Sequence, residues 1–218
     1  MTFSIIAVDK KSGSVGGAVA SKLIGVGSLV THARANIGVV ATLTCRSDPI
    51  RFRYGQEGLS LLSQQLSADD VLARLLRVDD KKDQMQLSVI DRSGRVATFT
   101  GKLMPEWCGN LTGEGFSIQG NTLAGPKVLS SMFDTFSSST GDFATKLAMA
   151  LKAGDEAGGD RRGKQGAGLL VVKEYGGVLG ISDDVVNLRV DDHPEAVREL
   201  IRMLPGYMET FQNRRLSD

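Results

Sequence analysis

The sequence feature that most constrains the fold is a pair of short apolar segments at the start of the chain, joined by a turn. Residues 3–8 are mostly β-branched and apolar, which predicts a strand. Residues 9–14 contain the lysines, serines and glycine of a hairpin turn. Residues 15–20 form a second strand with many small side chains. The hairpin therefore predicts that Ser21 returns beside Thr2.

Thr2 follows Met1, and a methionine before a small residue is the kind usually removed in cells. We therefore expect Thr2 to become the first residue. Its α-amino group, with an ordinary pKa of about 7.7–8.0, would then be the base for its own hydroxyl. Lys22, at the end of the hairpin, would favour the neutral amine by charge repulsion. The alternative is a strand followed by an ordinary surface lysine, and these residues alone leave both interpretations open.

The composition restricts the class of protein. The chain has 218 residues and a formal net charge of +1, which predicts a single domain over residues 1–218 with a substantial core. A net charge near zero gives no support for binding nucleic acid or an anionic membrane. The apolar runs are too short to span a bilayer, and no signal-peptide pattern is evident. We therefore expect a cytoplasmic protein with a small-molecule substrate.

The cysteines and histidines do not suggest a metal site. Cys45 and Cys108 are far apart in the sequence, and so are His32 and His193. Their spacing matches no zinc-ligand pattern, and a cytosolic location favours reduced thiols. We therefore expect no metal and no cofactor. His32 is either a half-buried packing residue or a base, and His193 is either a neighbour of a helix cap or a functional residue.

The continuous apolar run at residues 37–44 predicts a buried strand. Thr42, near its end, is a candidate for contact with substrate. The loop that follows contains Arg46, Arg51 and Arg53. These arginines either bind a carboxylate or phosphate or remain solvated.

A second informative stretch, residues 113–125, reads GEGFSIQGNTLAG. It predicts a strand at residues 116–118, a tight turn at residues 119–121 and a helix beginning near residues 123–126. Such a turn directs main-chain N–H groups and the Asn121 amide into one pocket, where they suit an anionic group or a developing oxyanion. Gln119 is then a candidate substrate contact. The alternative is an ordinary asparagine in a glycine turn.

A third stretch, residues 154–165, reads GDEAGGDRRGKQ and precedes a predicted strand at residues 167–172. A charged, glycine-rich loop beside a buried strand is typical of a functional site, although a solvated loop remains the alternative. The candidates are Asp160, Arg161, Arg162 and Gln165. The paired arginines suggest a substrate that carries a carboxylate. Further on, Asp192 and Pro194 predict the start of a last helix, with His193 as a neighbour of its cap.

Two further helices are predicted, one at residues 55–65 and one that begins at Ser67, which stands three residues before Asp70 as an N-cap serine does. Residues 104–112 are expected in a loop, residues 179–181 in a strand and residues 194–203 in the last helix. The predicted strands and helices are segregated rather than strictly alternating. This order favours an α+β fold, with a pair of mostly antiparallel sheets and helices on the outside.

Four stretches together resemble the DUF1028 family of uncharacterised proteins, which is assigned to the N-terminal-nucleophile (Ntn) hydrolase superfamily. They are TFSIIAVDKKSGSVGGAVASK, GEGFSIQGNTLAG, GGDRRGKQGAGLLVV and RVDDHPEAVREL. The resemblance extends over nearly the whole chain. It implies a four-layer αββα sandwich, and the superfamily is compatible with a homo-oligomer.

Proteasome β-subunits of the same superfamily also begin with threonine on a strand. The resemblance implies that Thr2 is a nucleophile, that Ser21 and Lys22 occupy the helper position, and that Asp160 orients either the N-terminal amine or Thr2. This chain departs from the pattern in two places. It has no carboxylate at Ser21, and Gly163 replaces the serine of the last motif.

The resulting hypothesis is an amide hydrolase that acts on a small acyl-amino acid or a peptide-like substrate. The alternative is an inactive Ntn-like domain that binds a small anionic ligand. The proposed catalytic residues are Thr2, Lys22, Asn121 and Asp160, and the proposed substrate contacts are Ser21, Thr42, Gln119, Arg161, Arg162 and Gln165.

Overall fold

The computed structural model describes residues 2–45 and 53–212, which form two antiparallel sheets and five α-helices. The strands are β1 (Thr2–Asp9), β2 (Ser14–Ser21), β3 (Thr31–Arg34), β4 (Gly38–Thr44), β5 (Met85–Asp91), β6 (Val96–Thr100), β7 (Gly109–Gly113), β8 (Phe116–Gly120), β9 (Gly166–Val172) and β10 (Asp184–Val190). The helices are α1 (Arg53–Ser63), α2 (Ala68–Arg77), α3 (Lys127–Ser138), α4 (Phe143–Glu156) and α5 (Ala196–Gln212).

The predicted hairpin lies at the centre of the larger sheet. That six-stranded sheet has the order β10-β9-β2-β1-β8-β7. Strand β1 pairs with β2 in a register that places Thr2 opposite Ser21 and Asp9 opposite Ser14. Gly13 adopts a φ of 75° in the connecting turn, a conformation that costs glycine little. The sequence prediction that Ser21 returns beside Thr2 is confirmed.

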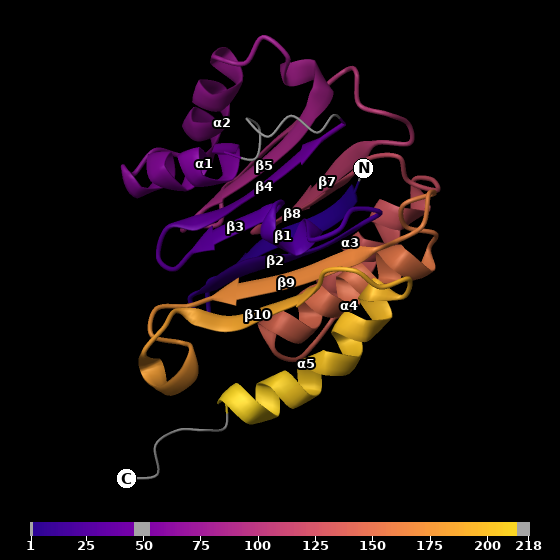
Figure 1. The fold of residues 1–218 in the computed structure, drawn as a ribbon. Helices are drawn as coiled ribbons and strands as arrows, with labels where there is room; N and C mark the ends of the chain where they lie inside the picture. Colours follow the sequence, from indigo (N-terminus) through magenta and orange to yellow (C-terminus); the bar gives the residue numbers. More distant parts are fainter. Residues whose placement is uncertain (1, 46–52, 213–218) are drawn as a thin grey trace.

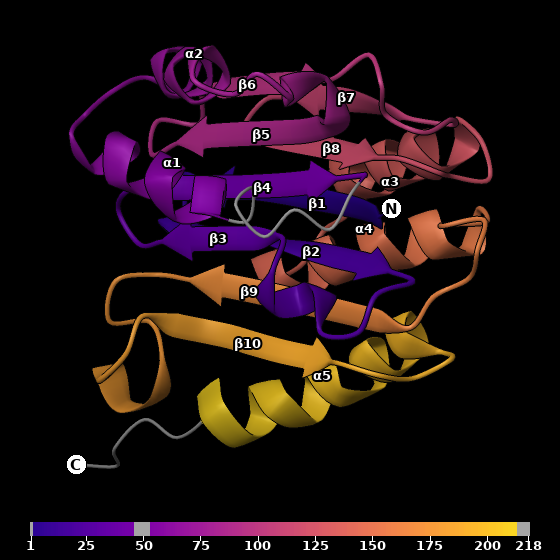
Figure 2. The ribbon, with the colours of Figure 1, turned by 45° about the horizontal axis from the view of Figure 1, so that its top comes forward.

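The smaller sheet has the order β3-β4-β5-β6, and helices α1 and α2 pack against one of its faces. Val40, Leu59 and Leu87 are buried together in that layer. The other face of this sheet is turned towards β1 and β2, where Ile6 and Ile90 share an apolar cluster. Figures 1 and 2 show α1 and α2 on the side away from the larger sheet.

Helices α3, α4 and α5 cover the opposite face of the six-stranded sheet (Figure 1). Because side chains alternate along a strand, β1 divides its residues between two environments. Phe3 and Ile5 are buried against the helices, whereas Ile6 is buried between the sheets. Thr2 and Ser4 share the inter-sheet face with Ile6. The alternation therefore directs the Thr2 hydroxyl away from the helices.

Three predicted elements differ from the structure. Residues 109–112 were expected in a loop but belong to edge strand β7, whose two glycines and Asn110 give a weak strand signal until β8 supplies hydrogen-bond partners. Gln119 and Gly120 belong to β8 rather than to a turn, and α3 begins only at Lys127. Residues 179–181 were expected as a strand, but Val178–Gly180 forms a short 3-10 turn.

The last helix also runs further than the predicted residues 194–203. Helix α5 continues through Pro205 to Gln212. Its buried residues Val197, Leu200 and Leu204 lie at helical spacing against the sheet. None of the described helices is long and apolar enough to cross a membrane.

Candidate functional site

Thr2 lies between two neighbours at one end of the six-stranded sheet. Its Oγ1 donates a hydrogen bond of 3.0 Å to Ser21 Oγ. Its main-chain N–H donates to the carbonyl of Asn121 at 3.3 Å, and its own carbonyl accepts from the Asn121 N–H at 3.0 Å. Thr2 is only 3% exposed. The hydroxyl and the main-chain nitrogen are therefore both held in fixed positions.

Lys22 follows the end of β2 and presents an exposed side chain. Its main-chain N–H donates to Asp160 Oδ2 at 3.3 Å. On the other side of this segment, the carbonyl of Ser21 accepts from the N–H of Gln165 at 2.8 Å. The chain that follows β2 is thus fixed by the charged loop before β9.

Asp160 is the buried charge of this region. Its side chain is completely buried and forms an ion pair with Arg162, with Nη2 lying 2.7 Å from Oδ2. The Oδ1 atom accepts from the main-chain N–H of Arg162 at 3.0 Å and from its Nε at 3.1 Å. These bonds offset the cost of burying the carboxylate. The side-chain bonds of Asp160 among the described residues go to Lys22 and Arg162, so Asp160 contacts the chain after β2 rather than Thr2 itself.

The amide of Asn121 is used inside the fold. Asn121 is fully buried, and its Nδ2 donates to Gln86 Oε1 on β5 at 2.9 Å. Its Oδ1 has no hydrogen-bond partner among the described residues. The sequence prediction directed the Asn121 amide and main-chain N–H towards an oxyanion. In the structure the side-chain amide donates a hydrogen bond to Gln86 on the other sheet. The main-chain N–H donates to the Thr2 carbonyl, because the pairing between β1 and β8 extends to this point.

Gln119 likewise joins the two sheets. Its Oε1 accepts from Ser88 Oγ at 2.8 Å, and its Nε2 donates to the carbonyl of Ala41 at 3.2 Å. Ser88 Oγ also lies 3.0 Å from Ser117 Oγ. Gln119 is therefore a buried structural tie rather than a residue open to solvent.

Local sequence patterns did not single out Gln86 and Ser88, which supply the β5 side of this polar network. The available signal was alternation: polar and apolar residues alternate over residues 85–89 of β5 and residues 116–119 of β8. Over these stretches the polar side chains of each strand share one face, and these faces meet between the sheets. Which polar side chains would pair depended on contacts distant in sequence.

The remaining predicted contacts are spread out. Thr42 pairs with Leu87 in the ladder, which places it on the α1 and α2 face of its sheet, away from Thr2. The Gln165 Nε2 donates to Asp192 Oδ1 at 3.0 Å. Arg161 is exposed, and its main-chain N–H donates to the Thr122 carbonyl at 3.1 Å.

Only one of the three arginines of the predicted basic loop can be placed. Arg53 begins α1, and its Nε lies 3.1 Å from a carboxylate oxygen of Glu57. Arg46 and Arg51 lie outside the described residues.

The two histidines have structural partners. His32 Nε2 lies 3.2 Å from the Leu29 carbonyl, and burial lowers the pKa of His32 below its ordinary value. The His193 Nδ1 accepts from the N–H of Glu195 at 3.0 Å, close to the start of α5. Both contacts agree with the packing and capping alternatives.

Among the described residues, the thiols and the acidic side chains form no cluster suited to a metal ion. Cys45 and Cys108 are unpaired and partly buried, and burial raises the pKa of the Cys108 thiol. Within residues 2–45 and 53–212, no group of three or more His, Cys, Asp or Glu side chains could hold a metal ion.

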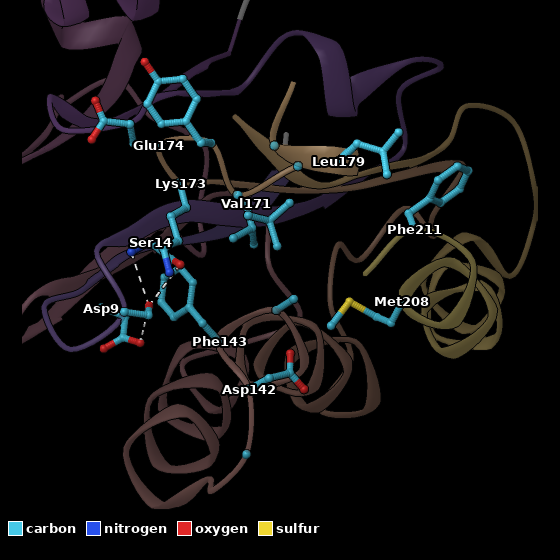
Figure 3. A pocket seen from close by; sticks show the side chains of 18 residues that line it. Asp9, Ser14, Asp142, Phe143, Val171, Lys173, Glu174, Leu179, Met208 and Phe211 are labelled. Carbon is cyan, nitrogen blue, oxygen red and sulfur yellow. Dashed lines mark hydrogen bonds between the residues drawn. The ribbon is translucent and has the colours of Figure 1, made fainter. Parts of the chain in front are cut away.

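A pocket with a volume of 730 Å³ lies at the other end of the hairpin, beside Asp9 and Ser14 (Figure 3). Phe143, Met208 and Phe211 form part of its apolar wall. Burial acts to raise the pKa of Asp9, but hydrogen bonds from Ser12 and the Lys11 N–H outweigh it, so the pKa lies below its ordinary value. Seven steps along β1 separate this pocket from Thr2, or about 23 Å.

The comparisons with known proteins point to one family. The sequence model of a family described as "Family of unknown function (DUF1028)" matches residues 2–200. The chain is also similar to protein SPO2555 from Silicibacter pomeroyi, whose crystal structure is described as belonging to the same family. The identity is 28%, the TM-score is 0.84, and the match covers 95% of this chain and 89% of that one. A search of curated proteins found no match.

Proposed function

This chain belongs to the DUF1028 family, and we propose that it is an amide hydrolase of the N-terminal-nucleophile type, with Thr2 as its nucleophile. The observation that carries the proposal is the environment of Thr2. A hydroxyl bonded to Ser21 Oγ and a main-chain nitrogen bonded to the Asn121 carbonyl are held together at the end of a central strand.

The arrangement of the sheets supports the proposed superfamily. Helices α1 and α2 cover one sheet, helices α3, α4 and α5 cover the other, and an apolar cluster lies between the sheets. This arrangement agrees with the four-layer αββα sandwich that Ntn hydrolases adopt. The superfamily assignment is part of the proposal.

The proposed reaction requires removal of Met1, which converts the Thr2 nitrogen into a free amine. The amine accepts the Oγ1 proton as Oγ1 bonds to the substrate carbonyl carbon and the C=O electron pair moves to oxygen. The C=O bond re-forms as the C–N bond breaks, and the leaving nitrogen takes the proton from the Thr2 ammonium group. A water molecule, deprotonated by the same amine, then attacks the ester on Thr2. The C–Oγ1 bond breaks, the carboxylic acid leaves, and the ammonium group returns a proton to Oγ1.

The charged residues would tune and direct this chemistry. The exposed ammonium group of Lys22 follows the segment that pairs with Thr2, and its positive charge disfavours protonation of the Thr2 amine. Asp160 holds the main chain of Lys22 in place. The exposed guanidinium of Arg161, beside the buried Asp160–Arg162 pair, suits a substrate carboxylate.

One observation favours a second candidate, an Ntn-like domain that binds a small anionic ligand without turning it over. Thr2 is only 3% exposed, whereas an attacking hydroxyl must reach a carbonyl carbon. In this candidate, Arg161 would hold the anion and Thr2 would have only a structural role.

The deciding experiment compares Thr2→Ala and Thr2→Ser in protein whose intact mass confirms that Met1 is absent. The substrates are a panel of N-acyl amino acids and dipeptides, with release of the free amine as the readout. We expect Thr2→Ala to abolish turnover and Thr2→Ser to retain part of it, because serine keeps the hydroxyl. Full activity in folded Thr2→Ala would refute the proposal, and ligand stabilisation without turnover in the parent protein would support the binding domain.

A further inference from the structure

We infer that Gln86 fixes the side-chain amide of Asn121 so that it offers an acceptor oxygen to the α-ammonium group of Thr2. This inference rests on the proposed function, since it requires a free Thr2 amine. It makes Gln86, which lies on the other sheet, a positioning residue of the Thr2 site.

The orientation of the Gln86 amide follows from its partners. One end of the amide lies 3.0 Å from the main-chain carbonyl of Gly109 and 3.1 Å from Thr100 Oγ1. A carbonyl oxygen can only accept a hydrogen bond, so the end facing Gly109 must be the Nε2 group. The acceptor Oε1 is therefore directed elsewhere, and it faces Asn121.

The orientation of Asn121 follows from that of Gln86. Because Oε1 of Gln86 can only accept, the Asn121 atom that lies 2.9 Å from it must be Nδ2. The remaining polar atom is Oδ1, which is buried and has no hydrogen-bond partner among the described residues. Buried acceptors are normally paired, so this oxygen is suited to a donor that residues 2–45 and 53–212 do not provide while Met1 is attached.

Thr2 is the residue that would gain such a donor. Asn121 and Thr2 exchange both main-chain hydrogen bonds, and residues paired in this way project their side chains on the same face of a sheet. The Asn121 main-chain carbonyl already accepts from the Thr2 nitrogen at 3.3 Å. Removal of Met1 converts that single N–H into an amine, and protonation gives it three hydrogens. Asn121 then offers two acceptor oxygens, one from the main chain and one from the side chain.

This arrangement assigns Asn121 a different task from the one expected of a turn residue. The proton that leaves Oγ1 in the proposed reaction moves to the amine, so positive charge develops on the Thr2 nitrogen. Acceptors placed at a site of developing charge stabilise the transition state without later reorganisation. Asn121 therefore stabilises the ammonium group. Gln86 prevents the Asn121 side-chain amide from rotating by a half turn, which would exchange Oδ1 and Nδ2.

The test measures the α-amino pKa directly and needs no substrate. A protease that cleaves an N-terminal fusion immediately before Thr2 releases the free amine, whether or not cells remove Met1. NMR titration of isotope-labelled threonine then gives the pKa. We expect Asn121→Ala to lower it by about one unit, a tenfold change in the protonation equilibrium, because the ammonium loses an acceptor. Gln86→Met should shift the pKa of the Thr2 amine in the same direction, since the Asn121 side-chain amide can then rotate and exchange its oxygen for its nitrogen.

Ser88→Ala is the matched control, because Ser88 is a buried polar residue on the same strand and the same face as Gln86. A shift in Asn121→Ala no larger than in Ser88→Ala would overturn the inference. The parent protein provides a test that does not depend on folding of the variants. Its Asn121 Cγ chemical shift should change with the same midpoint as the Thr2 amine, and a Cγ shift that stays constant through that midpoint would also overturn it.

Failure of the inference can be told apart from failure of the proposed function. If the Asn121 Cγ shift follows the titration of the Thr2 amine but no amide substrate is hydrolysed, the contact between Asn121 and the Thr2 amine is supported and the hydrolase proposal fails. If amides are hydrolysed through Thr2 but the Asn121 resonance does not respond, the hydrolase proposal is supported and this inference fails.

Discussion

The guanidinium of Arg162 donates to both carboxylate oxygens of Asp160, two residues earlier in the chain. The side chain of Asp160 is completely buried. The pair secures the turn before β9, and Asp160 also bonds to the N–H of Lys22. One carboxylate therefore joins this turn to the chain that follows Ser21, the residue opposite Thr2.

Arg162→Ala should destabilise the protein more than removal of an exposed arginine. It leaves a buried carboxylate without its cation, a change that costs about 3–5 kcal/mol at fully buried sites and less here, because the Arg162 side chain is 35% exposed. Urea unfolding of Arg162→Ala and of the control Arg161→Ala measures the difference. Equal free energies of unfolding in the two variants would contradict the importance of the pair.

Ser21→Ala should reduce both stability and hydrolysis. It removes the acceptor of the buried Thr2 hydroxyl, and leaving such a group unpaired costs about 1–3 kcal/mol. Ser4→Ala is the control, because Ser4 lies on the same face of the sheet and its buried Oγ has no hydrogen-bond partner among the described residues. Thermal unfolding and turnover of the substrate panel are the readouts. A larger loss in Ser4→Ala than in Ser21→Ala would argue against the Thr2–Ser21 bond.

Gly16→Ala should destabilise the central sheet. A Cβ at Gly16 would lie 2.1 Å from the main-chain oxygen of Leu170 on β9, so the two strands would have to move apart. Strain of this kind typically costs about 1–3 kcal/mol. Gly125→Ala is the control, because a Cβ there meets no atom within 4 Å. The difference in urea midpoint between the two variants tests the prediction, and no difference would contradict it.

Asp91 should make the protein sensitive to acid. Burial acts to raise its pKa, but hydrogen bonds from Ser93 and Arg95 outweigh burial, so the folded-state pKa lies below the ordinary value. A lowered carboxyl pKa contributes stability above the unfolded-state value of about 3.9, and that contribution is lost as the pH falls through the folded-state pKa.

The free-energy difference between the parent protein and Asp91→Asn should therefore be largest near neutral pH and shrink below about pH 3.9. Unfolding measured across that range provides the test, with the exposed Asp80→Asn as the control. A difference that grows as the pH falls would reverse the sign of the prediction.

Local patterns in the sequence were enough to predict the hairpin and several helix starts. The turn at Gly13 fixes the register that brings Thr2 and Ser21 together. Ser67 caps α2 as predicted, since its Oγ accepts from the Asp70 N–H at 3.2 Å. These features depend on residues close together in the chain, so their physical causes can be recognised in the sequence.

Features that depend on distant contacts were not predictable in the same way. Strand β7 forms because β8 provides its partner, and the side of the sheet that Thr42 occupies follows from pairing with Leu87. The bond between Gln86 and Asn121 joins two sheets across 35 positions of sequence. No local pattern specifies which buried amides will meet.

The central position of β1 has a consequence for the order of events during synthesis. Phe3 pairs with Gly120, and in the folded chain Thr2 is nearly inaccessible. A peptidase that removes Met1 therefore has the best access before β8 has been made and docked. At about 5–20 residues per second, the ribosome leaves an interval on the order of ten seconds. On the hydrolase proposal, maturation of Thr2 is fastest when Met1 is removed before β8 docks, and chains that fold first would need a local opening at the start of β1 before they could be trimmed.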